Sequence, residues 1–209
     1  MLQEFCPKEF DAIIIFIIAF LSTYFIIPKI IWVVNSRDLI DKPDHRSSHE
    51  SSTPTMAGVS FFLSIIAVLF FTKAIDVDNV GINLISALTV IFIIGLKDDL
   101  VVSSPKAKMG GQILAATALL MNQPFQMIYL EGFLGMHTLP IYLTIPVIIF
   151  TMLAIINAYN LIDGIDGLAS IIGIVIFSGY AVIFSILGTQ FYFLFALGLI
   201  GVLLAYLRY

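Results

Sequence analysis

Long apolar segments constrain the fold of this chain more than any other feature. They cover residues 12–34, 55–75, 81–96, 110–121, 141–158, 168–187 and 191–207. A helix needs roughly 20 apolar residues to cross the hydrocarbon core of a bilayer, and most of these segments approach that length. The sequence therefore predicts an all-α, polytopic transmembrane helix bundle with about seven membrane spans. No composition change marks a second domain, so residues 1–209 are expected to form a single integral membrane domain.

The composition excludes an ordinary soluble domain. Hydrophobic residues make up 60% of the chain and charged residues 11%, whereas soluble domains are about half apolar and a quarter charged. Cys6 is the single cysteine, so an internal disulfide is excluded and a thiolate metal site is disfavoured. The net acidic start and the length of the first apolar segment favour a membrane helix over a signal peptide.

The basic residues predict the orientation of the spans. Cytoplasmic loops of membrane proteins carry the excess of Lys and Arg. If the spans alternate, one side receives Lys29, Arg37, Lys42, Arg46, Lys97, Lys106, Lys108 and Arg208, and the other receives Lys8 and Lys73. The first side is then cytoplasmic and the N-terminus lies outside. The loops 35–54, 97–109 and 157–167 all converge on the cytoplasmic face.

Two of these loops carry charges that suit phosphate chemistry. In "GLKDDL" the adjacent carboxylates of Asp98 and Asp99 repel each other unless a cation lies nearby. A solvated helix end beside Lys97 explains the pair equally well. Lys108, in "SSPKAKMGGQ", could meet a phosphate as a point charge, although the excess of positive charge in cytoplasmic loops also explains it.

The segment "NAYNLIDGIDGLA" has a more specific pattern. Oxygen-bearing side chains recur at every third position, at Asn157, Asn160, Asp163 and Asp166. Gly164 and Gly167 disfavour a continuous helix and indicate a helix end that opens into a turn. Oxygen donors of this kind suit magnesium. A polar helix end capped by asparagine is the alternative, and a calcium loop of the EF-hand type fits less well because the terminal Glu is absent.

The loop "DKPDHRSSHESSTPTMAG" supplies Arg46 and His49, and alone it would be an ordinary solvated loop. Together, however, the three segments resemble three successive signatures of the polyprenyl-phosphate N-acetylhexosamine-1-phosphate transferases, which are glycosyltransferases of family 4. "DKPDHR" and "NLIDGIDGLA" resemble the branch that uses N-acetylglucosamine. "TPTMAG" leans toward the branch that uses the muramyl pentapeptide nucleotide, but the lysine usual before that Thr-Pro is absent.

The resemblance implies an activity and its partners. Members of the family transfer a sugar 1-phosphate from a uridine diphosphate sugar to a lipid such as undecaprenyl phosphate, and so initiate cell-envelope polysaccharides such as lipopolysaccharide O-antigen. The resemblance also implies an enzyme of the bacterial inner membrane that depends on magnesium, for which manganese can substitute. Membrane lipid is an expected partner, and nucleic acid is not. Pairing with a second copy is left open.

The resemblance also implies roles for single residues. The catalytic residues are Asp98, Asp99 and Asp163. The substrate-binding residues are Arg46, His49, Lys108, Asn157, Asn160 and Asp166. The metal ligands are Asp99, Asn160 and Asp163.

Two other functions also fit part of this sequence pattern. A transporter would place its ionisable residues near mid-membrane, whereas these cluster at span ends. Members of the family continue beyond these motifs with a further aspartate and a His-rich loop, and the sequence ends at Tyr209 before either. An inactive membrane scaffold is therefore the second alternative, and the 209-residue chain is expected to lack turnover by itself.

Overall fold

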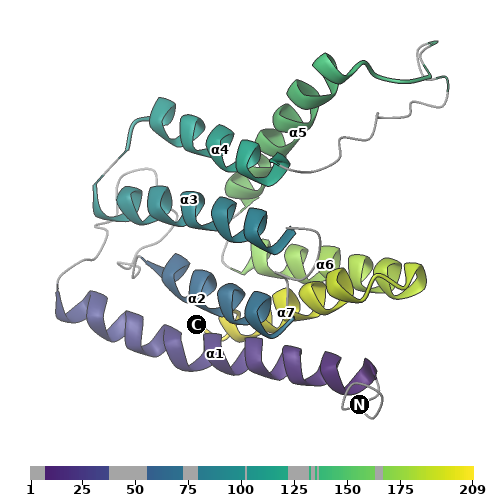
Figure 1. The fold of residues 1–209 in the computed structure, drawn as a ribbon. Coiled ribbons are helices and arrows are strands. Elements are labelled where there is room, and N and C mark those ends of the chain that lie inside the picture. Colours follow the sequence, from purple (N-terminus) through teal and green to yellow (C-terminus); the bar gives the residue numbers. More distant parts are fainter. Residues whose placement is uncertain are drawn as a thin grey trace.

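The computed structural model describes residues 8–37, 56–72, 80–101, 103–121, 132, 135, 137–162 and 167–209. Its elements in chain order are α1 (Lys8–Ser36), α2 (Ala57–Phe71), α3 (Val80–Leu100), α4 (Pro105–Leu120), α5 (Ile141–Ile162), α6 (Leu168–Leu187) and α7 (Gln190–Tyr206). Every element within these described ranges is a helix, which confirms the predicted all-α fold (Figure 1).

Four of the described helices are long and apolar enough to cross a membrane. These spans are Phe10–Ser36, Val80–Leu100, Tyr142–Ile162 and Leu168–Leu187. The apolar helices Ala57–Phe71 and Gln190–Tyr206 are shorter, with 15 and 17 residues. The chain is thus a multi-pass membrane bundle, and the count of seven spans stays a prediction.

The helices run back and forth, and most of them lie side by side. α1 packs most extensively against α7, which also packs against α6, while α2 contacts α1, α3 and α7. α3 packs along α4, and α5 leans across the bundle at a steeper angle (Figure 1). Among the described helices α5 packs mainly against α4 and α6, and less extensively than the other helices pack, so few interactions hold its position.

The core lies where α1, α2 and α7 meet. Its buried side chains are Ala12, Ile15, Ala19, Val68, Leu194 and Val202. Glycine brings α7 close to α1, since a Cβ on Gly201 would lie 2.7 Å from the carbonyl oxygen of Phe16. Small residues at helix interfaces permit this approach in membrane proteins, where dispersion contacts replace the hydrophobic effect as the driving force.

Polar groups inside the bundle are paired. Thr23 of α1 donates its hydroxyl hydrogen to Ser64 of α2 at 2.9 Å, and both side chains are buried. The amide of Asn83, in the first turn of α3, donates to the carbonyl oxygen of Met121 just after α4. An unpaired polar group in hydrocarbon costs several kcal/mol, so these pairs remove a penalty and also fix helix register.

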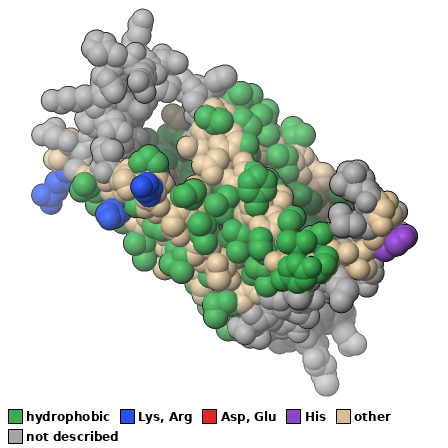
Figure 2. All heavy atoms as spheres, turned by 90° about the horizontal axis from the view of Figure 1, so that it is seen from above, with side chains coloured by type: hydrophobic (Ala, Val, Ile, Leu, Met, Phe, Trp, Pro, Cys, Tyr) green, Lys and Arg blue, Asp and Glu red, His purple; other side chains and the backbone are tan. Residues whose placement is uncertain are grey.

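The helix ends that the loops 35–54, 97–109 and 157–167 connect lie toward the same end of the bundle. In Figure 1, α1 and α3 end and α2 and α4 begin at the left, while α7 ends and α6 begins nearer the centre of the view. Figure 2 shows Lys and Arg side chains at one end of a face that is otherwise largely apolar. This arrangement agrees with the predicted convergence on one face, although the loop 35–54 lies almost wholly outside the described residues.

We expect Gly201→Ala to destabilise the bundle by about 1–3 kcal/mol, because the added Cβ would be forced against the backbone of α1. Thermal unfolding in detergent measures the effect. Gly179→Ala in α6 is the matched control, since a Cβ there meets no atom of the described structure within 4 Å. Equal unfolding temperatures for the two variants would contradict close packing of α1 on α7.

Candidate functional site

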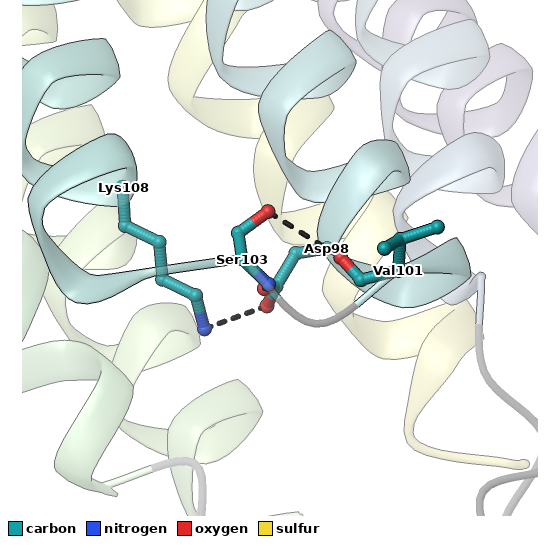
Figure 3. A network of polar contacts seen from close by, with 4 residues as sticks. All are labelled: Asp98, Val101, Ser103 and Lys108. Atoms are coloured by element: carbon teal, nitrogen blue, oxygen red, sulfur yellow. Dashed lines mark hydrogen bonds and ion pairs between the residues drawn. The ribbon is translucent and has the colours of Figure 1, made fainter.

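The end of α3 and the start of α4 form an ion-paired corner (Figure 3). Lys108 Nζ lies 2.7 Å from Asp98 Oδ2, and the backbone N–H of Ser103 donates to Asp98 Oδ1 at 3.0 Å. Both carboxylate oxygens therefore have a donor, which fixes the orientation of the side chain. The side chains of Lys108 and Asp98 are 47% and 29% exposed, so a ligand can reach the pair.

Local sequence explains why this corner forms. Ser104 is the N-cap of α4, and its hydroxyl oxygen accepts the N–H of Ala107 at 3.3 Å. Pro105 follows at the first helical position, where its missing N–H costs nothing and its fixed φ suits a helix. The N-terminus of α4 is the positive end of its dipole, and it faces the Asp98 carboxylate across a short link.

Close packing holds α4 against α3 beyond the corner. A Cβ on Gly111 would overlap the end of the Ile94 side chain, so this glycine lets the two helices approach with Ile94 in its observed position. Gly111 is buried, and it comes three residues after Lys108. The packing therefore sets the distance at which Lys108 can meet Asp98.

α4 also reaches the third motif, through a residue that sequence reasoning missed. The amide Nδ2 of Asn157 donates to Gln112 Oε1 at 3.2 Å and to the carbonyl oxygen of Leu153 at 2.8 Å. Gln112 follows Lys108 by four residues, and this spacing puts both side chains on one face of α4. The signal was present in the quoted motif "SSPKAKMGGQ", as an amide one helical turn after the lysine.

The helix break predicted in "NAYNLIDGIDGLA" is confirmed. α5 ends at Ile162 and α6 begins at Leu168, with Gly167 as its N-cap at φ 71°, a left-handed conformation that favours glycine. The hydroxyl of Tyr159 donates to the carbonyl oxygen of Ala169, which ties the end of α5 to the start of α6.

The structure brings part of the predicted site together. Asp98 and Lys108 are in contact, and Asn157 is linked to them through α4. Asp99 is exposed in the last turn of α3, and Asn160 is exposed three residues after Asn157 on α5. Four predicted residues lie outside the described residues: Arg46, His49, Asp163 and Asp166.

The described residues leave the predicted metal ligands untested. Within the described ranges, no three His, Cys, Asp or Glu side chains gather closely enough to hold an ion. The donors that are described, the Asp99 carboxylate and the Asn160 amide oxygen, belong to the class that magnesium prefers. Asp163, the third predicted ligand, is not among the described residues, so magnesium binding stays a prediction.

Comparison with known proteins identifies the family. A sequence model described as glycosyl transferase family 4 matches residues 81–209, which include the corner at Asp98 and Lys108 and the whole third motif. The chain belongs to glycosyl transferase family 4. The resemblance predicted from the three motifs is thereby confirmed at the level of the family.

Individual relatives of this family 4 chain carry two kinds of name. The decaprenyl-phosphate N-acetylglucosaminephosphotransferase of Mycobacterium leprae is 28% identical over 166 residues, which are 75% of this chain and 42% of that protein. The phospho-N-acetylmuramoyl-pentapeptide-transferase of Streptococcus pneumoniae (strain CGSP14) is 30% identical over 211 residues, 91% of this chain and 62% of that protein. That of Staphylococcus carnosus is 28% identical over 218 residues, 92% and 66% respectively. The chain thus spans between 42% and 66% of the length of these relatives.

We expect Tyr159→Phe to loosen the junction of α5 and α6, because a lost hydrogen bond costs about 0.5–1.5 kcal/mol. Hydrogen–deuterium exchange should rise in peptides from the end of α5 and the start of α6. Tyr180→Phe is the control, since Tyr180 lies in α6 away from this junction and its ring stacks on Phe184 of the same helix. Unchanged exchange in Tyr159→Phe would show that the junction does not depend on this hydroxyl.

Proposed function

We propose that this family 4 chain acts in the transfer of a sugar 1-phosphate from a uridine diphosphate sugar to a polyprenyl phosphate such as undecaprenyl phosphate. One observation carries the proposal: the Asp98–Lys108 ion pair is joined through α4 to Asn157, at the end of a membrane bundle. Lys108 is about half exposed, so its ammonium can meet a phosphate as a point charge while Asp98 keeps it in place.

The chemistry of the reaction requires such a group. A lipid phosphate that attacks a diphosphate brings several negative charges together, so the rate depends on positioning and on positive charge. Lys108 contributes one positive charge at the corner of α3 and α4. A magnesium ion would neutralise further charge on the diphosphate, and Asp99, Asn160 and Asp163 are the residues that we propose to hold it.

The position of the polar residues favours a transferase over a transporter. Asp98, Lys108 and Asn157 lie in the first or last two turns of their helices. A transport site is expected near mid-membrane, whereas a lipid phosphate lies at the membrane surface. The excess of basic residues supports a cytoplasmic location for this end, where nucleotide sugars are made.

For the donor we propose uridine diphosphate N-acetylglucosamine or a related N-acetylhexosamine, in a reaction that initiates a cell-envelope polysaccharide. The motifs "DKPDHR" and "NLIDGIDGLA" support this choice. The muramyl pentapeptide nucleotide is the second candidate, because relatives named for it match this chain at 28–30% identity, as closely as those named for N-acetylglucosamine.

An exchange assay tests the proposal. Labelled uridine monophosphate should exchange into uridine diphosphate N-acetylglucosamine faster than into the muramyl pentapeptide nucleotide, in membranes that contain undecaprenyl phosphate. We would assay the chain by itself and a fusion to the part of the Streptococcus pneumoniae relative that follows its matched region. Exchange should stop in EDTA and return with magnesium or manganese. The proposal would be contradicted if neither the chain by itself nor the fusion exchanged label into either nucleotide sugar.

Point variants test which side chains the exchange reaction requires. They are made in the chain or in the fusion, whichever shows exchange. Asp99→Asn and Lys108→Met should each cut exchange more than tenfold, which is about 1.4 kcal/mol or more in the barrier. Asp11→Asn, at the opposite end of the bundle, and Lys106→Met are the matched controls and should exchange normally. If Asp99→Asn and Lys108→Met also exchange normally, both side chains have structural roles.

The proposed orientation has its own test. In a Cys6→Ser background, a cysteine at Ser103 should react with an impermeant thiol reagent only from the cytoplasmic side. One at Asn79 should react only from outside, because the two positions flank α3. Labelling of position 103 from outside would place the site where nucleotide sugars are absent.

A further inference from the structure

Gln112 joins the two helices that carry the site. It is half-buried near the middle of α4, and its Oε1 accepts a hydrogen from Asn157 Nδ2 at 3.2 Å. α4 and α5 share few other contacts. A polar side chain placed inside a membrane bundle is a candidate for function when it contacts a residue of the site.

Two hydrogen bonds, to Leu153 and to Gln112, hold the Asn157 amide in one orientation. An asparagine amide has two N–H donors and one acceptor oxygen. Both donors of Asn157 are directed at oxygens, the backbone carbonyl of Leu153 and the side-chain oxygen of Gln112. If the amide flipped, Oδ1 would face the backbone carbonyl of Leu153, which cannot donate, and that arrangement is repulsive. In the observed orientation Gln112 Oε1 accepts the second amide hydrogen. The orientation is therefore set, and Oδ1 is the group left to meet a ligand.

The Leu153 carbonyl alone gives weaker control. Leu153 lies on the same helix, four residues earlier, so it moves together with Asn157. This bond therefore does not fix the position of Asn157 relative to residues on other helices. Gln112 lies on α4, together with the ammonium of Lys108. Through Gln112, the acceptor oxygen of Asn157 is held in a defined relation to the charge that is proposed to bind phosphate.

We infer that Gln112 is a positioning residue: it orients Asn157 so that Oδ1 accepts a hydrogen bond from the bound nucleotide sugar. The inference rests on the proposed function for the identity of the ligand. Gln112 itself does not touch the substrate. Loss of the Gln112 acceptor oxygen should therefore weaken binding of the nucleotide sugar only through its effect on Asn157.

The first measurement tests the orientation without any substrate. The side-chain amide of Asn157 would be followed by NMR in the detergent-solubilised, asparagine-labelled chain, with Asn157→Ala to assign its signals. Gln112→Leu should shift these signals and speed their hydrogen exchange. Gln112→Glu, which keeps an acceptor oxygen, should preserve them. Thr117→Val is the matched control on α4, because the hydroxyl of Thr117 bonds to Ile113 of its own helix.

The second measurement is the dissociation constant for uridine diphosphate N-acetylglucosamine, in the chain and in the fusion used above. Misplacing a contact group costs on the order of tenfold or more, so Gln112→Leu should weaken binding by about that factor. The double variant Gln112→Leu with Asn157→Ala should bind no more weakly than Asn157→Ala, because one residue acts through the other.

The outcomes separate this inference from the proposed function. Unchanged Asn157 signals in Gln112→Leu would overturn the inference, and so would additive losses of binding in the double variant. A different result would contradict the proposed function. In that case Gln112→Leu shifts the Asn157 signals, but the wild-type protein neither binds nor exchanges the nucleotide sugar. The control of Asn157 by Gln112 would then stand.

Discussion

The hydrocarbon core of the bilayer is the constraint on which the rest of this structure depends. Backbone N–H and C=O groups find no water there, so each spanning segment must satisfy its own hydrogen bonds and becomes a helix. Ionisable side chains are costly at the same depth and are pushed toward the helix ends. The charged residues of the candidate site, Asp98 and Lys108, obey this rule, since they lie near the end of α3 and the start of α4.

The polar contacts of the site are too weak to have placed the helices. An exposed ion pair such as Asp98–Lys108 contributes about 0.2–1 kcal/mol, and a hydrogen bond between membrane helices contributes on average about 0.6 kcal/mol. The short capped link before α4 and the close approach of Gly111 to Ile94 fix the two helices instead. The polar contacts then choose side-chain orientations on a scaffold that packing has already set.

Sequence reasoning located the helices well, and its deviations have local causes. The apolar segment at 168–187 matches α6 in both bounds. α4 begins at Pro105, five residues before its apolar segment at 110, because the cap at Ser104 starts the helix in polar sequence. α5 continues to Ile162, past the apolar end at 158, because Asn157 and Asn160 lie on the helix and do not terminate it. An apolar pattern detects burial in lipid, and it does not detect caps.

The sequence by itself determined the class of fold and the family, because hydropathy and motif order are properties of the chain alone. Only the tertiary structure decided which side chains meet. The adjacent carboxylates at the end of α3 predicted a nearby cation, but not that Lys108 would pair with Asp98. The contact of Gln112 with Asn157 was not predicted at all, since these residues are 45 positions apart in the sequence. Such a contact depends on the packing of α4 between α3 and α5, which no local pattern encodes.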